Sequence, residues 1–223
     1  MPSLLEIVQN VIVKLYDLDP RLPGAERFLI GDDGRRRFYG DARIVEVVRS
    51  DAFPAQVLVR PSEGEELRVS IYLPDAIIGR LEEHDPTRAL HEDNIDAFLC
   101  FVEEIDHFLL IASKWSRRRT VTLLELELHA NVTKHFVARH FLRRQLGVLP
   151  AQAALFLAYH LFHKRDFSDA DDAVRARYAD ARRLGVQYLR YLETLDAARR
   201  LRELRAWSDA SAQEKVSRIL LAA

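Results

Sequence analysis

The densest group of reactive side chains lies in the segment Cys100–Phe108, which reads CFVEEIDHF. Glu104 and His107 are three positions apart, so a helix that advances about 100° per residue places them on one face. The neighbouring positions are mostly apolar, and we expect both side chains to be buried. A buried carboxylate costs several kcal/mol unless it is paired, protonated or bound to a metal ion. The sequence therefore predicts a partner for Glu104 and His107 inside the fold.

A structural partner is the first hypothesis. Glu104 would pair with His107, or with a polar group on the following helix, and so fix the register of a helical bundle. The partners expected on that helix are Glu125 and His129, so the predicted buried polar cluster is Glu104, His107, Glu125 and His129.

A metal ion is the second hypothesis. Glu-x-x-His is the spacing by which di-iron helical bundles place two ligands on one helix. Such a centre needs a second Glu-x-x-His helix, and this chain contains only one such motif. For a divalent metal or a di-iron centre, the candidate ligands are Glu104, His107, Glu127, His160, His163 and Glu193. No other cofactor is predicted.

Other catalytic patterns are missing from the sequence. No glycine-rich phosphate loop and no Gly-x-Ser-x-Gly motif occur. The single cysteine, Cys100, excludes an intrachain disulfide, and its apolar surroundings predict a buried, unreactive thiol. The sequence leaves open whether the protein is an enzyme.

The charge balance argues against a protein dedicated to nucleic acid. The 223 residues include 33 basic and 34 acidic side chains, which gives a formal net charge of −1. Proteins that bind polyanions usually carry a basic excess. Two arginine clusters, Arg35–Arg37 and Arg117–Arg119, are interpreted as solvated loops in preference to phosphate-binding sites. Nucleic-acid binding through these clusters is the third and weakest functional hypothesis.

Glycine and proline divide the chain into two parts. Six of the 8 glycines lie before residue 80, and seven of the 8 prolines lie at or before Pro86. Because both residues favour turns, the first part should be turn-rich and the second built from long helices. We predict an α+β fold in which a small N-terminal antiparallel β-meander unit packs against a predominantly α-helical C-terminal bundle. The two subdomains cover residues 1–86 and 87–223 and form one continuous structural unit.

Apolar spacing and alternation locate the N-terminal elements. They are a helix over Leu4–Tyr16, strands over Ile44–Val48, Val57–Val59 and Leu67–Leu73, and a short helix over Pro74–Leu81. The last two strands should form a hairpin. A further hairpin is expected around Asp32–Gly34, because Asp-Gly between β-prone runs is a turn signal.

The expected C-terminal helices cover His91–Lys114, Thr120–Leu146, Pro150–Lys164, Ser168–Leu204 and a last short helix capped by Ser211. The first is apolar on every side, which predicts burial all round. The second opens with strand-like alternation over Val121–Leu128, yet its later apolar positions have helical spacing. In the fourth, apolar residues recur every seven positions from Val174 to Leu195, as in antiparallel bundle packing.

Location and function follow by elimination. No apolar run reaches the roughly 18 residues of a membrane span, and the N-terminus lacks a basic leader, so we expect a cytoplasmic protein without membrane contact. We expect a non-catalytic protein-binding or adaptor module that engages a protein partner or a second copy of itself. The alternative is a metal-dependent helical-bundle enzyme, redox or hydrolytic, built on Glu104 and His107.

Overall fold

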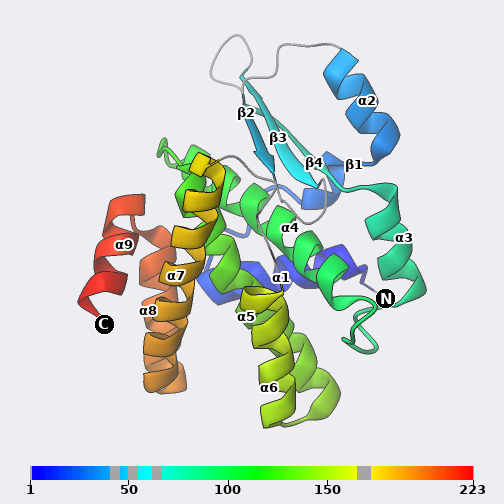
Figure 1. Ribbon diagram of the computed structural model, residues 1–223. Helices are drawn as coiled ribbons and strands as arrows, with labels where there is room; N and C mark the ends of the chain where they lie inside the picture. Colours follow the sequence, from blue (N-terminus) through cyan, green and yellow to red (C-terminus); the bar gives the residue numbers. More distant parts are fainter. Residues whose placement is uncertain (1, 41–45, 50–54, 62–66, 165–171, 223) are drawn as a thin grey trace.

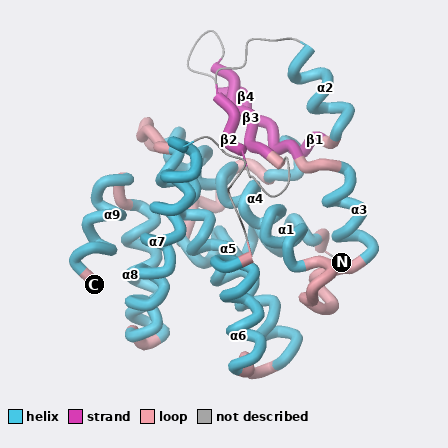
Figure 2. The backbone as a smooth tube through the Cα atoms, viewed as in Figure 1, coloured by secondary structure: helices cyan, strands magenta, loops and turns pink. Residues whose placement is uncertain are grey.

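The structure, a computed structural model, describes residues 2–40, 46–49, 55–61, 67–164 and 172–222. The helices are α1 (Leu4–Tyr16), α2 (Asp32–Gly40), α3 (Asp75–Glu83), α4 (Ile95–Ser116), α5 (Leu123–Leu146), α6 (Ala151–Ala158), α7 (Asp172–Thr194), α8 (Ala197–Asp209) and α9 (Ala212–Leu221). The other elements are the 3-10 turn η1 (Ala25–Phe28), the π-helical turn η2 (Tyr159–His163) and the strands β1 (Leu29–Ile30), β2 (Glu46–Arg49), β3 (Gln56–Pro61) and β4 (Leu67–Tyr72). The fold is α+β and mostly helical, with the sheet at one edge of the helical body (Figures 1 and 2).

The sheet is mixed, which corrects the expected antiparallel meander. Its strand order is β1-β4-β3-β2. The three strands β2, β3 and β4 are antiparallel neighbours, and the predicted hairpin forms with Val57 opposite Ile71. The short strand β1 then pairs in parallel with β4, with Leu29 opposite Ile71. Ile71 and Leu73 are buried, so one face of the hairpin covers the core as the alternation predicts.

The hairpin expected around Asp32–Gly34 is wrong, because these residues begin helix α2. Two carboxylates in the first turn of a helix are stabilised by the positive end of its dipole. The Tyr72 hydroxyl also donates a hydrogen bond to Asp32 at 2.6 Å, which ties the start of α2 to β4. A Cβ atom on Gly34 would lie 2.6 Å from Cβ of Ile30, so this glycine permits close packing and not a turn.

Helix α4 runs through the middle of the molecule and is buried on all sides, as predicted (Figure 1). It begins at Ile95 and not at His91. The four residues before it form a turn in which Asn94 Oδ1 accepts a hydrogen bond from the His91 backbone at 3.0 Å. Asn94 Nδ2 donates to the carbonyls of His84 and Ala89 and anchors this turn.

The apolar core is continuous across the predicted boundary at Pro86. Helix α1 contacts α4, α5 and α8, and strands β3 and β4 also contact α4. Buried residues of α1, such as Ile12, belong to the same apolar cluster as Phe98 on α4 and Trp207 on α8. The first helix is therefore part of the helical body, and the division into residues 1–86 and 87–223 stays a prediction.

Capping residues explain where the later helices begin and end. Segment Val121–Leu128 is helical from Leu123 onwards, because the Thr122 side chain accepts a hydrogen bond from the Glu125 backbone. The long helix expected to reach Leu204 is wrong: α7 ends at Thr194, and Asp196 caps a separate helix α8. The predicted capping box at Ser211 is confirmed. The expected cap at Ser168 lies outside the described residues.

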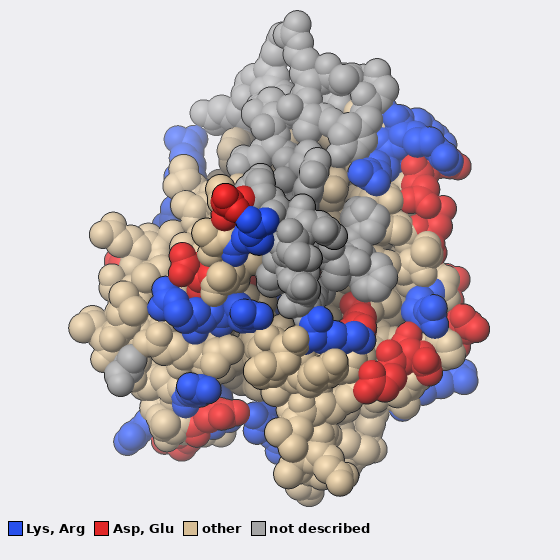
Figure 3. All heavy atoms as spheres, in the orientation of Figure 1, with Lys and Arg blue, Asp and Glu red and all other residues tan. Residues whose placement is uncertain are grey.

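No described helix combines the length and apolar character needed to cross a bilayer. Basic and acidic side chains lie close to one another in several places on the face drawn in Figure 3. They include ion pairs three positions apart on one helix, such as Arg183 with Asp180.

Cys100 gives a direct test of the buried central helix. Its side chain is fully buried on α4. We expect a thiol-reactive dye at neutral pH to leave the native protein unlabelled and to label one thiol per chain in denaturant, because a thiol packed among apolar groups is inaccessible and stays protonated. Rapid labelling of the native protein, followed by mass spectrometry, would show that this face of α4 is open.

Candidate metal centre between helices α4 and α5

Three charged side chains meet where α4 packs on α5. Glu103 and His107 lie one turn apart on α4, and Glu127 approaches them from α5. One ligand atom of each residue lies within 4.8 Å of the other two, and all three side chains are buried. Metal–ligand bonds of about 2.0–2.2 Å place ligand atoms roughly 3–4 Å apart, so a small contraction would bring this group to coordination distance. Glu104 lies beside it, and the four residues Glu103, Glu104, His107 and Glu127 are called the α4–α5 cluster below.

Five polar atoms of this cluster have no hydrogen-bond partner among the described residues. They are both carboxylate oxygens of Glu104, both ring nitrogens of His107, and Oε1 of Glu127. Glu104 Oε2 lies 3.8 Å from His107 Nδ1, which is too long for a hydrogen bond. Buried polar atoms in native proteins nearly always have partners, and an orphaned one indicates an ion or a water molecule that completes it.

The cluster carries more negative charge than its one lysine balances. Lys134 Nζ donates to Glu103 Oε2 at 2.7 Å, and both side chains are buried. Burial raises the pKa of Glu104, and burial together with Glu103 raises the pKa of Glu127 to about 7. Burial alone would lower the pKa of His107, but the Glu104 carboxylate and the other acids outweigh it and raise that pKa to about 9. In the absence of a cation, the site therefore holds extra protons.

A cavity of about 20 Å³ adjoins the cluster, and its lining includes Glu103, Glu127, Lys134 and Tyr178. A cavity of this size holds about one water molecule. The α4–α5 cluster thus has room for a small ligand, such as water, and not for an organic substrate.

The structure separates Glu125 from this cluster. Glu125 Oε1 accepts a hydrogen bond from Lys215 Nζ at 2.5 Å and lies 3.5 Å from Lys114 Nζ, and all three groups are buried. Burial lowers the pKa of Lys215 to about 8. Side chains two positions apart on a helix point about 200° apart, so Glu125 and Glu127 face different neighbours.

His129 belongs to a second buried network. Its Nδ1 lies 2.9 Å from both carboxylate oxygens of Asp106, and its Nε2 lies 3.0 Å from Ser208 Oγ. Burial lowers the pKa of His129, so the ring is neutral, with Nδ1–H donating to Asp106 and Nε2 accepting from Ser208. Thr133 Oγ1 also donates to Asp106 at 2.7 Å, and Tyr16 lies 2.8 Å from that hydroxyl. The expectation that Glu125 or His129 pairs with the cluster residues Glu104 and His107 is therefore wrong.

Ser208, His129 and Asp106 have the order of a nucleophile, its base and the acid that orients the base. Ser208 lies in the last turn of α8 and is 4% exposed, and Trp207 stacks on the His129 ring with centroids 5.3 Å apart. The enclosed serine gives a substrate carbonyl little access. We interpret the series of hydrogen bonds that runs from Tyr16 to Ser208 as a structural link between α1, α4, α5 and α8.

Of the six candidate metal ligands, His107 and Glu127 come together with Glu103, Glu104 lies beside His107, and three lie elsewhere. Glu104, His107 and Glu127 belong to the α4–α5 cluster. His160, in the π-helical turn, contacts Asp96 at 2.8 Å and Glu92 at 3.1 Å. His163 and Glu193 line a surface cleft beside α7.

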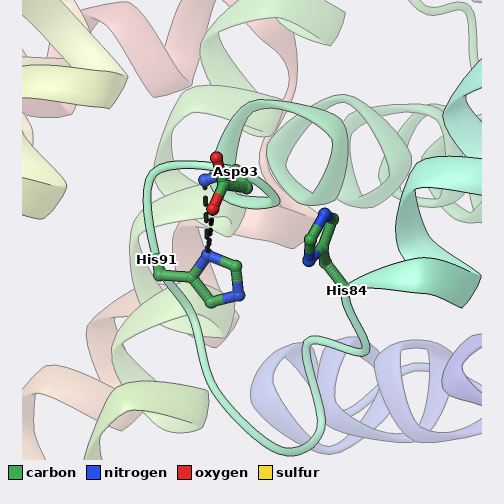
Figure 4. A group of neighbouring side chains, drawn as sticks. All are labelled: His84, His91 and Asp93. Atoms are coloured by element: carbon green, nitrogen blue, oxygen red, sulfur yellow. Dashed lines mark hydrogen bonds and ion pairs between the residues drawn. The ribbon is translucent and has the colours of Figure 1, made fainter.

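A second group of metal-ligand type lies near the surface. His84, His91 and Asp93 have ligand atoms within 4.8 Å of one another, and Figure 4 shows the two rings near each other with Asp93 next to a ring nitrogen of His91. The Asp93 backbone N–H already donates to His91 Nδ1 at 3.3 Å, and the rings meet edge to face. This group therefore offers fewer free ligand atoms than the α4–α5 cluster.

The sequence alone did not predict four residues of these buried polar groups, namely Glu103, Asp106, Ser208 and Lys215. Glu103 carries a usable signal, because it stands four positions before His107 and shares its face. Asp106 also carries one, as a charge within an apolar helix. Ser208 and Lys215 carry none, since only the folding of α8 and α9 against α5 brings them to His129 and Glu125.

Comparisons with protein-family models, with curated proteins and with solved structures find no match for this chain.

Proposed function

We propose that this protein binds a divalent metal ion in the α4–α5 cluster. The observation that carries the proposal is the set of five buried polar atoms without partners on Glu104, His107 and Glu127. One cation between α4 and α5 would satisfy several of them at once. Water alone is a weaker explanation, because it supplies no positive charge to a site rich in carboxylates.

The ligand types narrow the choice of metal. Carboxylate oxygens with one imidazole suit Mn²⁺, Fe²⁺ or Zn²⁺ better than metals that prefer thiolate ligands. Charge balance supports one divalent ion. With Lys134 paired to Glu103, the Glu104 and Glu127 carboxylates and a neutral His107 carry two negative charges, which a divalent cation neutralises.

The metal-dependent enzyme reading is a narrower form of this proposal. The adjoining cavity of about 20 Å³ limits reaction partners to molecules the size of water, dioxygen or peroxide. Redox or hydrolytic chemistry on a larger substrate would require α4 and α5 to separate.

Metal analysis of the untagged protein tests the proposal. The protein is purified without chelator, dialysed, and analysed by inductively coupled plasma mass spectrometry, and we expect about one Mn, Fe or Zn per chain. Melting curves are then recorded after chelator treatment and after addition of each metal. A metal at about 100 times its Kd should stabilise the fold by about 2.7 kcal/mol. A chain that contains no metal and whose melting temperature no added metal changes would exclude the proposal.

A protein-binding or adaptor role is the second candidate, and exposed apolar side chains at the α5–α6 connection favour it. Leu146, Val148, Leu155 and Tyr159 are each at least half exposed, with Val148 at 79%. In Figure 3 the lower end of the molecule, where Figure 1 places α6, is almost free of charged atoms. Apolar patches of this kind mark protein interfaces, and a patch without charge suits a second copy of the same patch.

Association through this patch predicts a concentration-dependent dimer. We expect sedimentation velocity to show dimers of the wild type and monomers of Leu155→Asp, because a carboxylate at a dry interface must lose its water. Leu201→Asp on α8, where the leucine is 37% exposed, is the control and should still dimerise. A wild type that stays monomeric at all concentrations would contradict self-association.

A further inference from the structure

A cleft of about 860 Å³ lies between α1, the second half of α5 and the start of α8. Its basic lining residues are Lys14, Arg139, His140, Arg143, Arg144 and Arg200. None of the described residues that line this cleft is acidic. Apolar side chains, among them Val11, Leu15 and Phe136, form the rest of the wall. The cleft is therefore both cationic and apolar.

The sequence of α5 concentrates this charge. Residues 128–165 contain no Asp or Glu, although the chain has 34 acidic residues in total. Arg139 and Arg143 stand four positions apart, as do His140 and Arg144, and like charges at this spacing repel on a helix. The helix dipole favours cations in the last turn, which accounts for Arg143 and Arg144 in part and leaves Arg139 unexplained.

Several exposed arginines elsewhere on this protein pair with an acid three positions earlier. Arg36 pairs with Asp33, Arg183 with Asp180, and Arg199 with Asp196. The corresponding positions before Arg139, Arg143 and Arg144 hold Phe136, His140 and Phe141. Neither Arg143 nor Arg144 makes an ion pair within the described part of the chain, and Arg139 has only Glu193 at 3.7 Å.

The positive potential of the cleft acts on its own side chains. Burial, then Arg144 and Lys14, lower the pKa of His140. Burial, then Arg200, lower the pKa of Arg139, with Arg143 adding to the effect and Glu193 opposing it. A bound anion would relieve this repulsion.

We propose that the cleft binds an organic phosphate whose uncharged part packs against Val11, Leu15 and Phe136. One arginine guanidinium group can donate two parallel hydrogen bonds to a phosphate group. The exposed side chains of Arg143 and Arg144 are suited to this role. The volume lies within the range of roughly 300–1,000 Å³ that small-molecule sites occupy. A nucleotide and a phospholipid with a single acyl chain share this chemistry, so the test must separate them. The site is independent of the α4–α5 cluster.

Isothermal titration calorimetry with four probes tests the proposal. They are ATP, 1-oleoyl lysophosphatidic acid below its critical micelle concentration, inorganic phosphate and a single-stranded oligonucleotide. We expect one of the two organic phosphates to bind at one per chain and to bind much more tightly than inorganic phosphate. ATP binding alone identifies a nucleotide site, and lysophosphatidic acid binding alone identifies a lipid site. A single-stranded oligonucleotide that binds more tightly than both would indicate a nucleic-acid surface and overturn the proposal.

Two variants locate the binding. Arg143→Glu/Arg144→Glu should weaken it by about tenfold or more, because each charged hydrogen bond contributes about 1.5–3 kcal/mol. Arg36→Glu on α2 removes an exposed arginine on a distant helix and should leave affinity unchanged (Figure 1). Melting curves check that both variants are folded. Binding of neither organic phosphate, or equal affinity of the wild type and the double variant, would overturn the proposal.

Discussion

Glu127→Gln is expected to abolish metal binding and to leave the protein folded. The amide keeps the shape of the side chain but removes a charged ligand, so affinity should fall by more than the roughly 10–100-fold that follows loss of an outer-shell partner. Without metal, the variant should be as stable as the wild type or more so, because burial raises the pKa of Glu127 to about 7 and already favours the uncharged form. Metal should raise the melting temperature of the wild type but not that of Glu127→Gln.

Glu193→Gln is the matched control for this change. Glu193 is a candidate ligand by sequence, but its side chain is 58% exposed and lies 3.7 Å from Arg139. The control should therefore keep the wild-type metal content and the wild-type response to added metal. Equal metal content in Glu127→Gln and Glu193→Gln would mean that the metal, if present, lies outside the α4–α5 cluster.

Asp106→Ala is expected to cost about 2–6 kcal/mol of the free energy of unfolding, because each of two buried donors left without an acceptor costs about 1–3 kcal/mol. The change leaves His129 Nδ1 and the Thr133 hydroxyl without the carboxylate that accepts from both. Ser208→Ala removes a single neutral hydrogen bond at the other end of the same network and should cost about 1 kcal/mol. Urea denaturation at constant pH measures both values.

Asp209→Ala provides the control for the Asp106 change. Asp209 pairs with Arg117 at the surface, where an ion pair contributes at most about 1 kcal/mol. If Asp106→Ala were no more destabilising than Asp209→Ala, the network would contribute little and the buried position of Asp106 would be in error.

Local signals predicted the elements well where one pattern dominates. Helix α1 begins and ends at the predicted residues, because apolar spacing and the Ser3 capping box agree. The all-round burial of α4 also follows from its composition. The failures arise where two signals compete. Asp-Gly suggested a turn at Gly34, but β1 pairs in parallel with β4, and the chain leaves it through a helix. The heptad pattern from Val174 to Leu195 suggested one long helix, but the Asp196 side chain caps a new helix, α8, one residue after that pattern ends.

The candidate site was predictable in part. Burial of Glu104 and His107 follows from the sequence of α4, and both are fully buried. Which residue of α5 meets them depends on the rotation of one helix against the other. Glu125 and Glu127 are two positions apart, so their side chains differ by about 200° of rotation around the helix axis. Glu125 therefore meets a lysine, whereas Glu127 meets the α4–α5 cluster. Helical periodicity gives the faces of a helix but not the angle at which another helix packs on it.

The buried links between distant segments affect the order in which the chain folds. Tyr16 meets Thr133 across 117 positions, and Glu125 meets Lys215 across 90. During synthesis, Glu125 therefore lacks Lys215 and His129 lacks Ser208 until α8 and α9 have emerged. An early α4–α5 pair would leave these polar groups incompletely paired within an otherwise apolar surface. Contacts that close such long loops slow folding and prolong aggregation-prone intermediates. We expect the helical body to become rigid in one late step, after synthesis of α9, and not helix by helix.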